Sequence, residues 1–114
     1  MKIQDKINYY KNNLDCFEDS MEKYKFLLDQ GRKSISFPEE FRENSFKVKG
    51  CQAQVWLVPY IKENLLYFHS DSDAFISKGM ITILCDIYGG NTPQDINKTD
   101  LNLLDNLNLN LLLT

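Results

Sequence analysis

The chain has 114 residues, with 13 Lys and Arg against 16 Asp and Glu, for a formal net charge of −3. Hydrophobic residues make up 43% and charged residues 25%, the balance of a single globular domain over residues 1–114 rather than of a disordered chain. The mild acidity and the lack of a basic run exclude the electrostatic footprint of a nucleic-acid-binding protein.

The N-terminus, from Met1 to Lys6, has no apolar stretch of the kind found in signal peptides. The longest apolar-rich window, Ile76–Tyr88, is shorter than the about 20 residues that cross a bilayer. We therefore expect a cytoplasmic protein without a membrane partner, in a reducing compartment. Three cysteines at wide spacing indicate free thiols rather than a disulfide framework, and they are Cys16, Cys51 and Cys85.

Two amphipathic helices are expected in the first third of the chain, because apolar residues recur there every three or four positions. The face of the first helix is formed by Ile3, Ile7, Tyr10 and Leu14. The face of the second is formed by Phe17, Met21, Tyr24, Leu27 and Leu28. Gly31 is expected to end the second helix.

A strand region follows, because β-branched and aromatic residues are enriched in Ser45–Lys49, Ala53–Tyr60 and Leu65–His69. Glu63 and Asn64 are expected to form the turn between the last two strands. Apolar residues alternate along the middle strand, which is typical of a sheet with one face packed on helices.

A third helix is expected from Asp73 to Tyr88, apolar on nearly every side and so buried in the fold. The acidic residues Asp71 and Asp73 favour its positively polarised N-terminal end, and Gly89 with the following glycine ends it. The order of elements predicts an α+β fold, with a three-stranded antiparallel sheet packed on one face by helices.

Two short features complete the C-terminal part. Thr92 followed by Pro93 is typical of a helix N-cap with proline at the first helical position. The last segment, Leu101–Thr114, consists almost entirely of Leu and Asn. Its spacing fits a strand and a helix equally, and we expect a frayed or partner-dependent end.

Cys51 is the candidate for chemistry, since it lies at the join between two expected strands, where a loop presents side chains. Gly50 lets the backbone turn without a Cβ clash. Lys47 and Lys49 bring positive charge, which favours the thiolate over a thiol whose ordinary pKa is about 8.5. The alternative is a buried cysteine that fills core space. The spacing alone leaves both interpretations open.

The other thiols and the single histidine have plainer expected roles. Cys16 lies between two helices and Cys85 on the apolar helix, so both are expected to pack as inert thiols. His69 is expected to be a partly buried or edge histidine of the third strand. A zinc or iron–sulfur site built from the thiols and His69 is disfavoured, because no pair of close metal ligands such as CxxC exists.

Two further residues suggest close packing. Trp56 is expected in the core or as an interface anchor. Gly79 lies inside a helix, where glycine costs about 1 kcal/mol relative to alanine. We expect close backbone packing there, against the loop that carries Cys51.

Three segments in the same order resemble the SufE/CsdE family of sulfur-acceptor proteins. Gly50–Leu57, read as GCQAQVWL, resembles the family's GCQSQVW segment. Ser70–Ala74 followed by Lys78–Ile81 resembles its SDSDA…GLI helix start, and Lys23–Gly31 resembles its RYxxLIxLG helix. The resemblance covers Phe17–Ile96.

The resemblance implies a fold shared with iron–sulfur scaffold proteins of the NifU type, without their metal ligands. It implies that Cys51 accepts persulfide sulfur from a cysteine desulfurase of the SufS/CsdA type. It also implies that docking of this protein stimulates that enzyme. It also implies delivery to a scaffold of the SufBCD type. Pyridoxal phosphate belongs to the desulfurase, so no cofactor and no metal is expected here. The other candidate residues, for the loop or the docking face, are Lys49, Gly50, Gln52, Gln54, Trp56, His69, Asp71 and Asp73.

Two features depart from the family pattern. Ala53 stands in place of the usual serine, and the family's last helix with its RxNGL segment is missing after Leu101–Thr114. The missing helix would leave apolar surface on Ile81, Leu84 or Tyr88, which favours self-association as a homodimer. The remaining alternatives are a regulatory module that docks on a desulfurase without accepting sulfur, and a metal or cluster scaffold.

Overall fold

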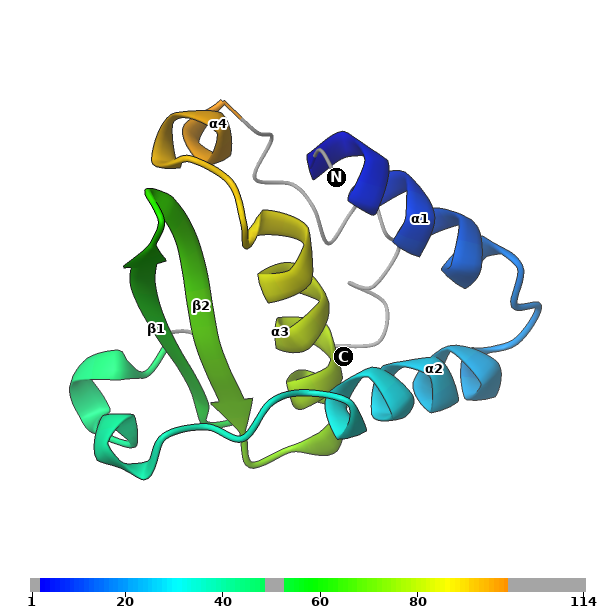
Figure 1. Ribbon diagram of the computed structural model, residues 1–114. Helices are drawn as coiled ribbons and strands as arrows, with labels where there is room; N and C mark the ends of the chain where they lie inside the picture. Colours follow the sequence, from blue (N-terminus) through cyan, green and yellow to red (C-terminus); the bar gives the residue numbers. More distant parts are fainter. Residues whose placement is uncertain (1–2, 49–52, 99–114) are drawn as a thin grey trace.

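The computed structural model describes residues 3–48 and 53–98. Its elements in chain order are α1 (Ile3–Asp15), α2 (Ser20–Arg32), the 3₁₀ turns η1 (Glu39–Phe41) and η2 (Asn44–Phe46), β1 (Val55–Lys62), β2 (Leu65–Ser72), α3 (Phe75–Tyr88) and α4 (Pro93–Asn97). Helix α3 lies between the sheet on one side and α1 and α2 on the other (Figure 1). None of the described helices is long and apolar enough to cross a membrane.

The main core forms where α1, α2 and α3 meet. The expected apolar face of α1 is confirmed, because all four of its predicted residues are buried. On α2 only Leu27 of the predicted face is fully buried, and Met21 is exposed instead, in the first turn of the helix. Helix α3 contributes Met80, Ile83 and Ile87 to the same cluster, so it is buried on most sides as expected.

Helices α2 and α3 approach each other at two glycines. A Cβ atom built on Gly79 would lie 2.0 Å from the carbonyl oxygen of Leu27, and one on Gly31 would lie 3.2 Å from the amide nitrogen of Gly79. Gly79 therefore serves close packing, which the structure shows against α2. The expected contact with the Cys51 loop involves residues outside the described ranges and stays a prediction. Gly31 does not end α2, which continues to Arg32.

The sheet has two strands among the described residues, β1 and β2, paired antiparallel from Val55 opposite Ser72 to Lys62 opposite Leu65. Glu63 and Asn64 form the hairpin turn as predicted, and both have positive φ, at 54° and 68°. This is the geometry of a tight hairpin connection, for which Asn is well suited.

The predicted strand at Ser45–Lys49 is wrong over its described part. Asn44–Phe46 forms the turn η2, and only a single bridge joins Lys47 to Trp56. The amides of Phe46 and Lys47 donate locally, to the carbonyls of Glu43 and Asn44 at 3.1 and 3.2 Å. Because these donors are satisfied inside the turn, they are not available to extend a ladder along β1.

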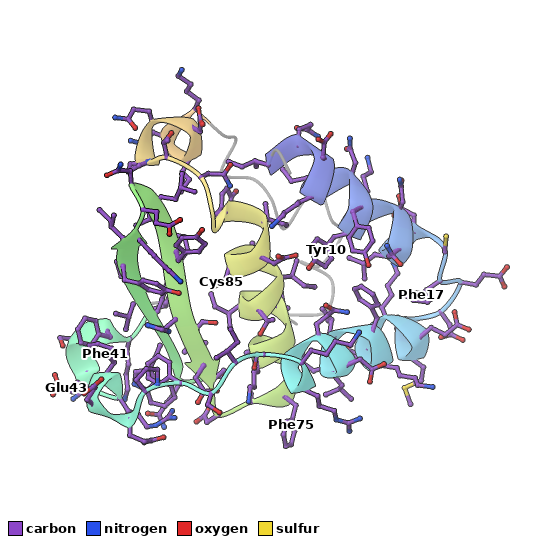
Figure 2. All side chains as sticks on the ribbon, in the orientation of Figure 1. Tyr10, Phe17, Phe41, Glu43, Phe75 and Cys85 are labelled. Carbon is purple, nitrogen blue, oxygen red and sulfur yellow. The ribbon has the colours of Figure 1, made fainter. Side chains whose placement is uncertain are left out.

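Helices cover one face of the sheet, but the other face is buried as well. Trp56 and Val58 of β1 pack there with Phe37, and with Phe41 and Phe46 at the edge of the cluster. These phenylalanines come from the segment between α2 and β1, which crosses in front of the sheet in Figure 1. Figure 2 shows Phe41 at the end of the molecule away from α1. The part of the second face around Trp56 and Val58 is thus covered by the segment that contains η1 and η2 rather than open to solvent.

The ends of the last helices follow their local sequence. Helix α3 begins at Phe75, two residues later than predicted, and its cap Ala74 offers no side-chain hydrogen bond. Thr92 caps α4 as predicted, with its hydroxyl accepting from the amide of Asp95 at 3.2 Å and Pro93 in the first turn. Leu101–Thr114 lies outside the described residues.

Candidate functional site

Cys51 lies outside the described residues, together with Lys49, Gly50 and Gln52. The structure does describe both flanks of that segment. The amide of Val48 donates to the carbonyl of Val55 at 2.8 Å, next to the bridge between Lys47 and Trp56. The chain therefore leaves the described structure at Val48 and returns to it at the same end of β1.

A second set of hydrogen bonds holds the returning chain at Gln54. The carboxylate of Asp73 accepts from the backbone amide of Gln54 at 3.0 Å and from its side-chain amide at 3.2 Å. In return, the Gln54 carbonyl accepts from the Asp73 amide at 3.1 Å and from the Ser72 hydroxyl at 2.8 Å. Two predicted site residues, Gln54 and Asp73, are thereby brought together, where β1 begins and α3 is about to start.

Asp71 lies at the centre of a group of charges on the same end of the sheet. Its carboxylate accepts from the guanidinium of Arg42 at 2.8 Å, and the ammonium of Lys78 lies 3.6 Å away. Arg42 also donates twice to Glu39, at 2.9 Å each. Neither Asp71 nor Asp73 lies in the first turn of α3 or caps it, because the helix begins at Phe75 and its N-cap is Ala74.

Sequence reasoning missed Arg42. Its guanidinium lies over two rings, 4.8 Å from the centroid of Trp56 and 5.1 Å from that of Phe37. Hydrogen bonding to Glu39 and Asp71 raises the pKa of Arg42, and its guanidinium lowers the pKa of Glu39. The spacing of Glu39 and Arg42, three residues apart beside an aromatic-rich stretch, is the signal that could have found this cluster.

Trp56 is confirmed as a core residue, at 6% exposed. Its indole N–H has no hydrogen-bond partner in the structure described. The Trp56 ring contacts two cations, because the ammonium of Lys47 lies 5.7 Å from its centroid in addition to the guanidinium of Arg42. Two cationic side chains therefore lie against Trp56, near the beginning of the strand that follows the Cys51 segment.

His69 is half-buried on β2, as predicted. Its imidazole stacks between two aromatic rings, with centroids 4.3 Å from Tyr60 and 6.0 Å from Phe41. No hydrogen bond from its ring reaches another described residue. This arrangement packs the imidazole and does not hold it against an acid or a base for proton transfer.

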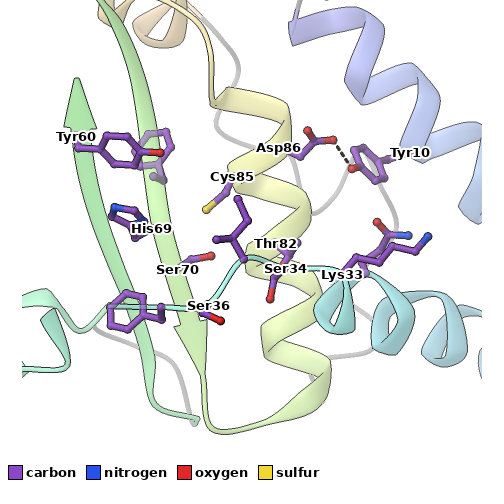
Figure 3. Close-up of a pocket in the computed structure, with 14 residues that line it drawn as sticks. Tyr10, Lys33, Ser34, Ser36, Tyr60, His69, Ser70, Thr82, Cys85 and Asp86 are labelled. Atoms are coloured by element: carbon purple, nitrogen blue, oxygen red, sulfur yellow. Dashed lines mark hydrogen bonds between the residues drawn. The ribbon is translucent and has the colours of Figure 1, made fainter. Parts of the chain in front are cut away.

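The two described cysteines differ in environment. Cys16 is exposed after α1, so the expectation that it packs in the core is wrong. Cys85 is partly buried, and its side chain points towards the sheet into a cavity of about 480 Å³ between α3, β2 and the 33–37 segment (Figure 3). Burial raises the pKa of the Cys85 thiol to about 11, partly offset by a hydrogen bond with Ser70. Cys85 is therefore a protonated thiol at neutral pH, consistent with the inert role expected of it.

No three His, Cys, Asp or Glu side chains within residues 3–48 and 53–98 come together in a group that could hold a metal ion. Cys51 is not part of that set, so the expected lack of a metal site stays a prediction.

Comparison with known proteins gives a consistent result. Residues 8–114 match the family described as "SufE: Fe-S metabolism associated domain". The cysteine desulfuration protein SufE of Wigglesworthia glossinidia brevipalpis is 39% identical over 84 residues, which are 73% of this chain and 58% of that protein. An uncharacterized SufE-like protein of Rhizobium meliloti is 34% identical over 91 residues, 76% of this chain and 63% of that protein. The chain thus spans less than two thirds of either curated relative.

Proposed function

Because the chain belongs to the SufE family, we propose that it accepts sulfur from a cysteine desulfurase on the thiol of Cys51. We further propose that it stimulates that enzyme and passes the sulfur to an iron–sulfur cluster assembly scaffold of the SufBCD type. Membership of the family supports the sulfur-transfer role in iron–sulfur metabolism. The choice of Cys51 is supported by its place in the GCQAQVWL segment.

The transfer step needs no oxidant or reductant. The Cys51 thiolate attacks the outer sulfur of the persulfide on the desulfurase cysteine. The sulfur–sulfur bond of that persulfide breaks, a new one forms on Cys51, and the electron pair leaves with the desulfurase thiolate. The proton lost from Cys51 balances the one gained by the departing thiolate. The pyridoxal phosphate that generates the persulfide belongs to the desulfurase, and this chain is proposed to bind no cofactor.

The observation that carries this proposal is the way the two ends of the Cys51 segment are held. The Val48–Val55 hydrogen bond closes the segment at its base, and the Gln54–Asp73 contacts attach its C-terminal side to the start of α3. A nucleophile carried between two fixed ends loses less conformational entropy when it meets the partner's persulfide. Such anchoring suits a group that is presented to another protein.

The charge distribution supports the thiolate form. Lys47 lies one residue before Val48, and its ammonium makes no ion pair in the described part of the chain. Arg42 and Lys78 are neutralised by Glu39 and Asp71. We expect Lys47, with Lys49 nearby in the sequence, to lower the pKa of the Cys51 thiol.

The experiment measures desulfurase turnover with cysteine as substrate, with and without this protein. As a sulfur carrier, the wild-type chain raises alanine production and Cys51→Ser does not, because the persulfide has no acceptor. A regulatory docking module stimulates equally well with Cys51→Ser. Cys16→Ser and Cys85→Ser serve as matched controls, and both retain stimulation under the proposal. Stimulation by Cys51→Ser at the wild-type level would overturn it in favour of the regulatory module.

A further inference from the structure

The outer edge of β2, which faces away from β1, is closed near its beginning and near its end. At Leu66, the amide donates to the carbonyl of Asn91 at 2.9 Å, and the carbonyl accepts from the amide of Gly90 at 2.8 Å. At Ser72, the amide donates to the carboxylate of Asp71 at 2.9 Å. The amides at both ends of this edge therefore have acceptors in the described part of the chain.

Between these ends, two residues of the edge are open. Groups that point to one edge of a strand recur every second residue, so the backbone groups of Phe68 and Ser70 point the same way as those of Leu66. Neither residue has a backbone hydrogen bond on this side to any residue within 3–48 or 53–98. Two donors and two acceptors are therefore unpaired in the middle of the strand. An extended peptide backbone matches this pattern, because it offers donors and acceptors at the same spacing.

The cavity beside Cys85 lies along the open part of the edge. It is lined by Phe68 and Ser70, whose side chains lie on one face of the sheet, and by His69 and Tyr60, whose side chains lie on the other. A single space touches both faces only where it extends around the edge of the strand. Its volume of about 480 Å³ falls within the range of sites that hold ligands.

A second wall of the cavity also consists of extended backbone. Ile35, Ser36 and Phe37 have no regular secondary structure, and their backbone groups make no hydrogen bond within the described residues. Figure 3 shows β2 on one side of the cavity and α3, with Thr82 and Cys85, on the other. The cavity therefore offers unpaired backbone groups on two of its walls.

The uncompensated charge at the cavity is positive. The ammonium of Lys33 makes no ion pair with a described residue, and Figure 3 shows it across the cavity from His69. The carboxylate of Asp86 is already held by the ammonium of Lys6, at 3.1 Å, and by the hydroxyl of Tyr10. A ligand that carries an acidic group therefore complements the cavity.

We propose that this cavity is a peptide-binding site, in which an extended acidic segment of a partner protein pairs with the edge of β2 at Phe68 and Ser70. The backbone of that segment supplies the partners that these two residues lack, and an acidic side chain of the segment meets Lys33. Because Leu66 and Ser72 are already engaged, the site takes only a short segment and resists the extensive edge-to-edge pairing that a longer open strand invites. The proposal goes beyond sulfur transfer and does not depend on it.

Titration with a synthetic peptide, followed by NMR of the backbone amides, tests the proposal. The probe is acetyl-VEVEV-amide, in which valine favours the extended conformation and glutamate supplies the charge. With the full chain saturated by the probe, the amides of Phe68 and Ser70 exchange at least about tenfold more slowly, because each gains a hydrogen bond. The amide of Leu66 is the internal control, since its bond to Asn91 is already made. A peptide with lysine in place of glutamate binds more weakly.

Two variants separate the backbone from the charge. Ser70→Pro removes one donor of the edge and leaves the ladder to β1 intact, because proline is tolerated where the N–H points away from the sheet. Its affinity for the probe falls at least about tenfold, whereas Ser70→Ala, which loses only the hydroxyl, retains it. Lys33→Glu, at an exposed position, reverses the preference between the glutamate and the lysine peptides. It also serves as the test if Ser70→Pro does not fold.

Amides of Phe68 and Ser70 that stay unchanged at millimolar probe overturn the proposal, as does equal affinity of Ser70→Pro and Ser70→Ala. Equal binding of the glutamate and lysine peptides by the wild type overturns the acidic partner. Slow exchange of both amides before any peptide is added overturns it as well, because the edge then already has a partner. That partner is a second copy of the chain if the protection rises with protein concentration.

Discussion

The carboxylate of Asp73 holds both the backbone amide and the side-chain amide of Gln54, at 3.0 and 3.2 Å. The two residues are 19 positions apart in the sequence, and the contact joins the beginning of β1 to the turn before α3. Gln54 is also three residues from Cys51. The contact therefore links the chain that follows the proposed sulfur-accepting segment to the turn that leads into the buried helix α3.

Asp73→Ala tests this link. Removal of the carboxylate leaves the Gln54 amide without its acceptor and is expected to lower stability by about 1 kcal/mol. The rate of sulfur acceptance from a desulfurase is expected to fall several-fold in Asp73→Ala. The rate of Asp73→Asn is expected to lie between those of the wild type and Asp73→Ala, because asparagine keeps one acceptor oxygen. Asp5→Ala, an exposed acid on α1, is the control and leaves the rate unchanged. An unaltered acceptance rate in Asp73→Ala would show that the link has no part in the transfer.

Arg42 is expected to be the most important surface arginine for stability. Arg42→Ala removes its hydrogen bonds to Asp71 and Glu39 and its contact with the Trp56 ring, so the melting temperature falls. Arg42→Lys recovers little of this loss, because an ammonium cannot bridge two carboxylates in a planar fork. Arg32→Ala, which removes a single longer contact of 3.7 Å with Asp29, serves as the control. Equal melting temperatures for Arg42→Ala and Arg32→Ala would contradict the expectation.

Gly79 and Gly31 form a matched pair for testing helix packing. Gly79→Ala forces a methyl group onto the carbonyl of Leu27 and is expected to cost about 3 kcal/mol or more. Gly31→Ala meets only a 3.2 Å contact, while it gains about 1 kcal/mol of helix propensity. Its net effect is therefore small. Denaturant unfolding measures the free energy of unfolding of both variants. Similar losses of stability in Gly79→Ala and Gly31→Ala would mean that α2 and α3 can separate at this crossing.

The helices of this fold were predictable because their signals are local. The apolar face of α1 and the cap and proline of α4 appear in the sequence at helical spacing, and the structure confirms them. Met21 and Gly31 were misassigned for a related reason. Periodicity does not tell which end of a helix meets the core, and a glycine near a helix end suits a stop as well as a close crossing.

The sheet was harder to predict, because strand pairing depends on distant residues. Ser45–Lys49 has strand-like composition, yet Phe46 buries its ring against Phe41, with centroids 5.6 Å apart, and its backbone turns. Arg42 was overlooked since its partners, Asp71 and Trp56, are 29 and 14 positions away. The pairing of Gln54 with Asp73 was likewise beyond local patterns, although the family resemblance had marked both residues.

The buried thiol of Cys85 predicts a pH dependence of stability. Burial raises its pKa to about 11 in the folded protein, so folding favours the protonated thiol. This contribution is fully present below about pH 9 and is lost as the pH rises towards 11. The melting temperature of the wild type therefore falls more steeply between pH 9 and 10.5 than that of Cys85→Ser. Parallel curves for the two proteins would contradict the burial of this thiol.

The central claim is that Cys51 receives the sulfur. The direct measurement is mass spectrometry of the intact protein and of its peptides, after incubation with a cysteine desulfurase and cysteine. We expect a mass gain of one sulfur atom on the peptide that contains Cys51, abolished by Cys51→Ser and by alkylation before incubation, and retained in Cys16→Ser and Cys85→Ser. Sulfur found on the Cys16 or Cys85 peptide while the Cys51 peptide stays unmodified would contradict the account.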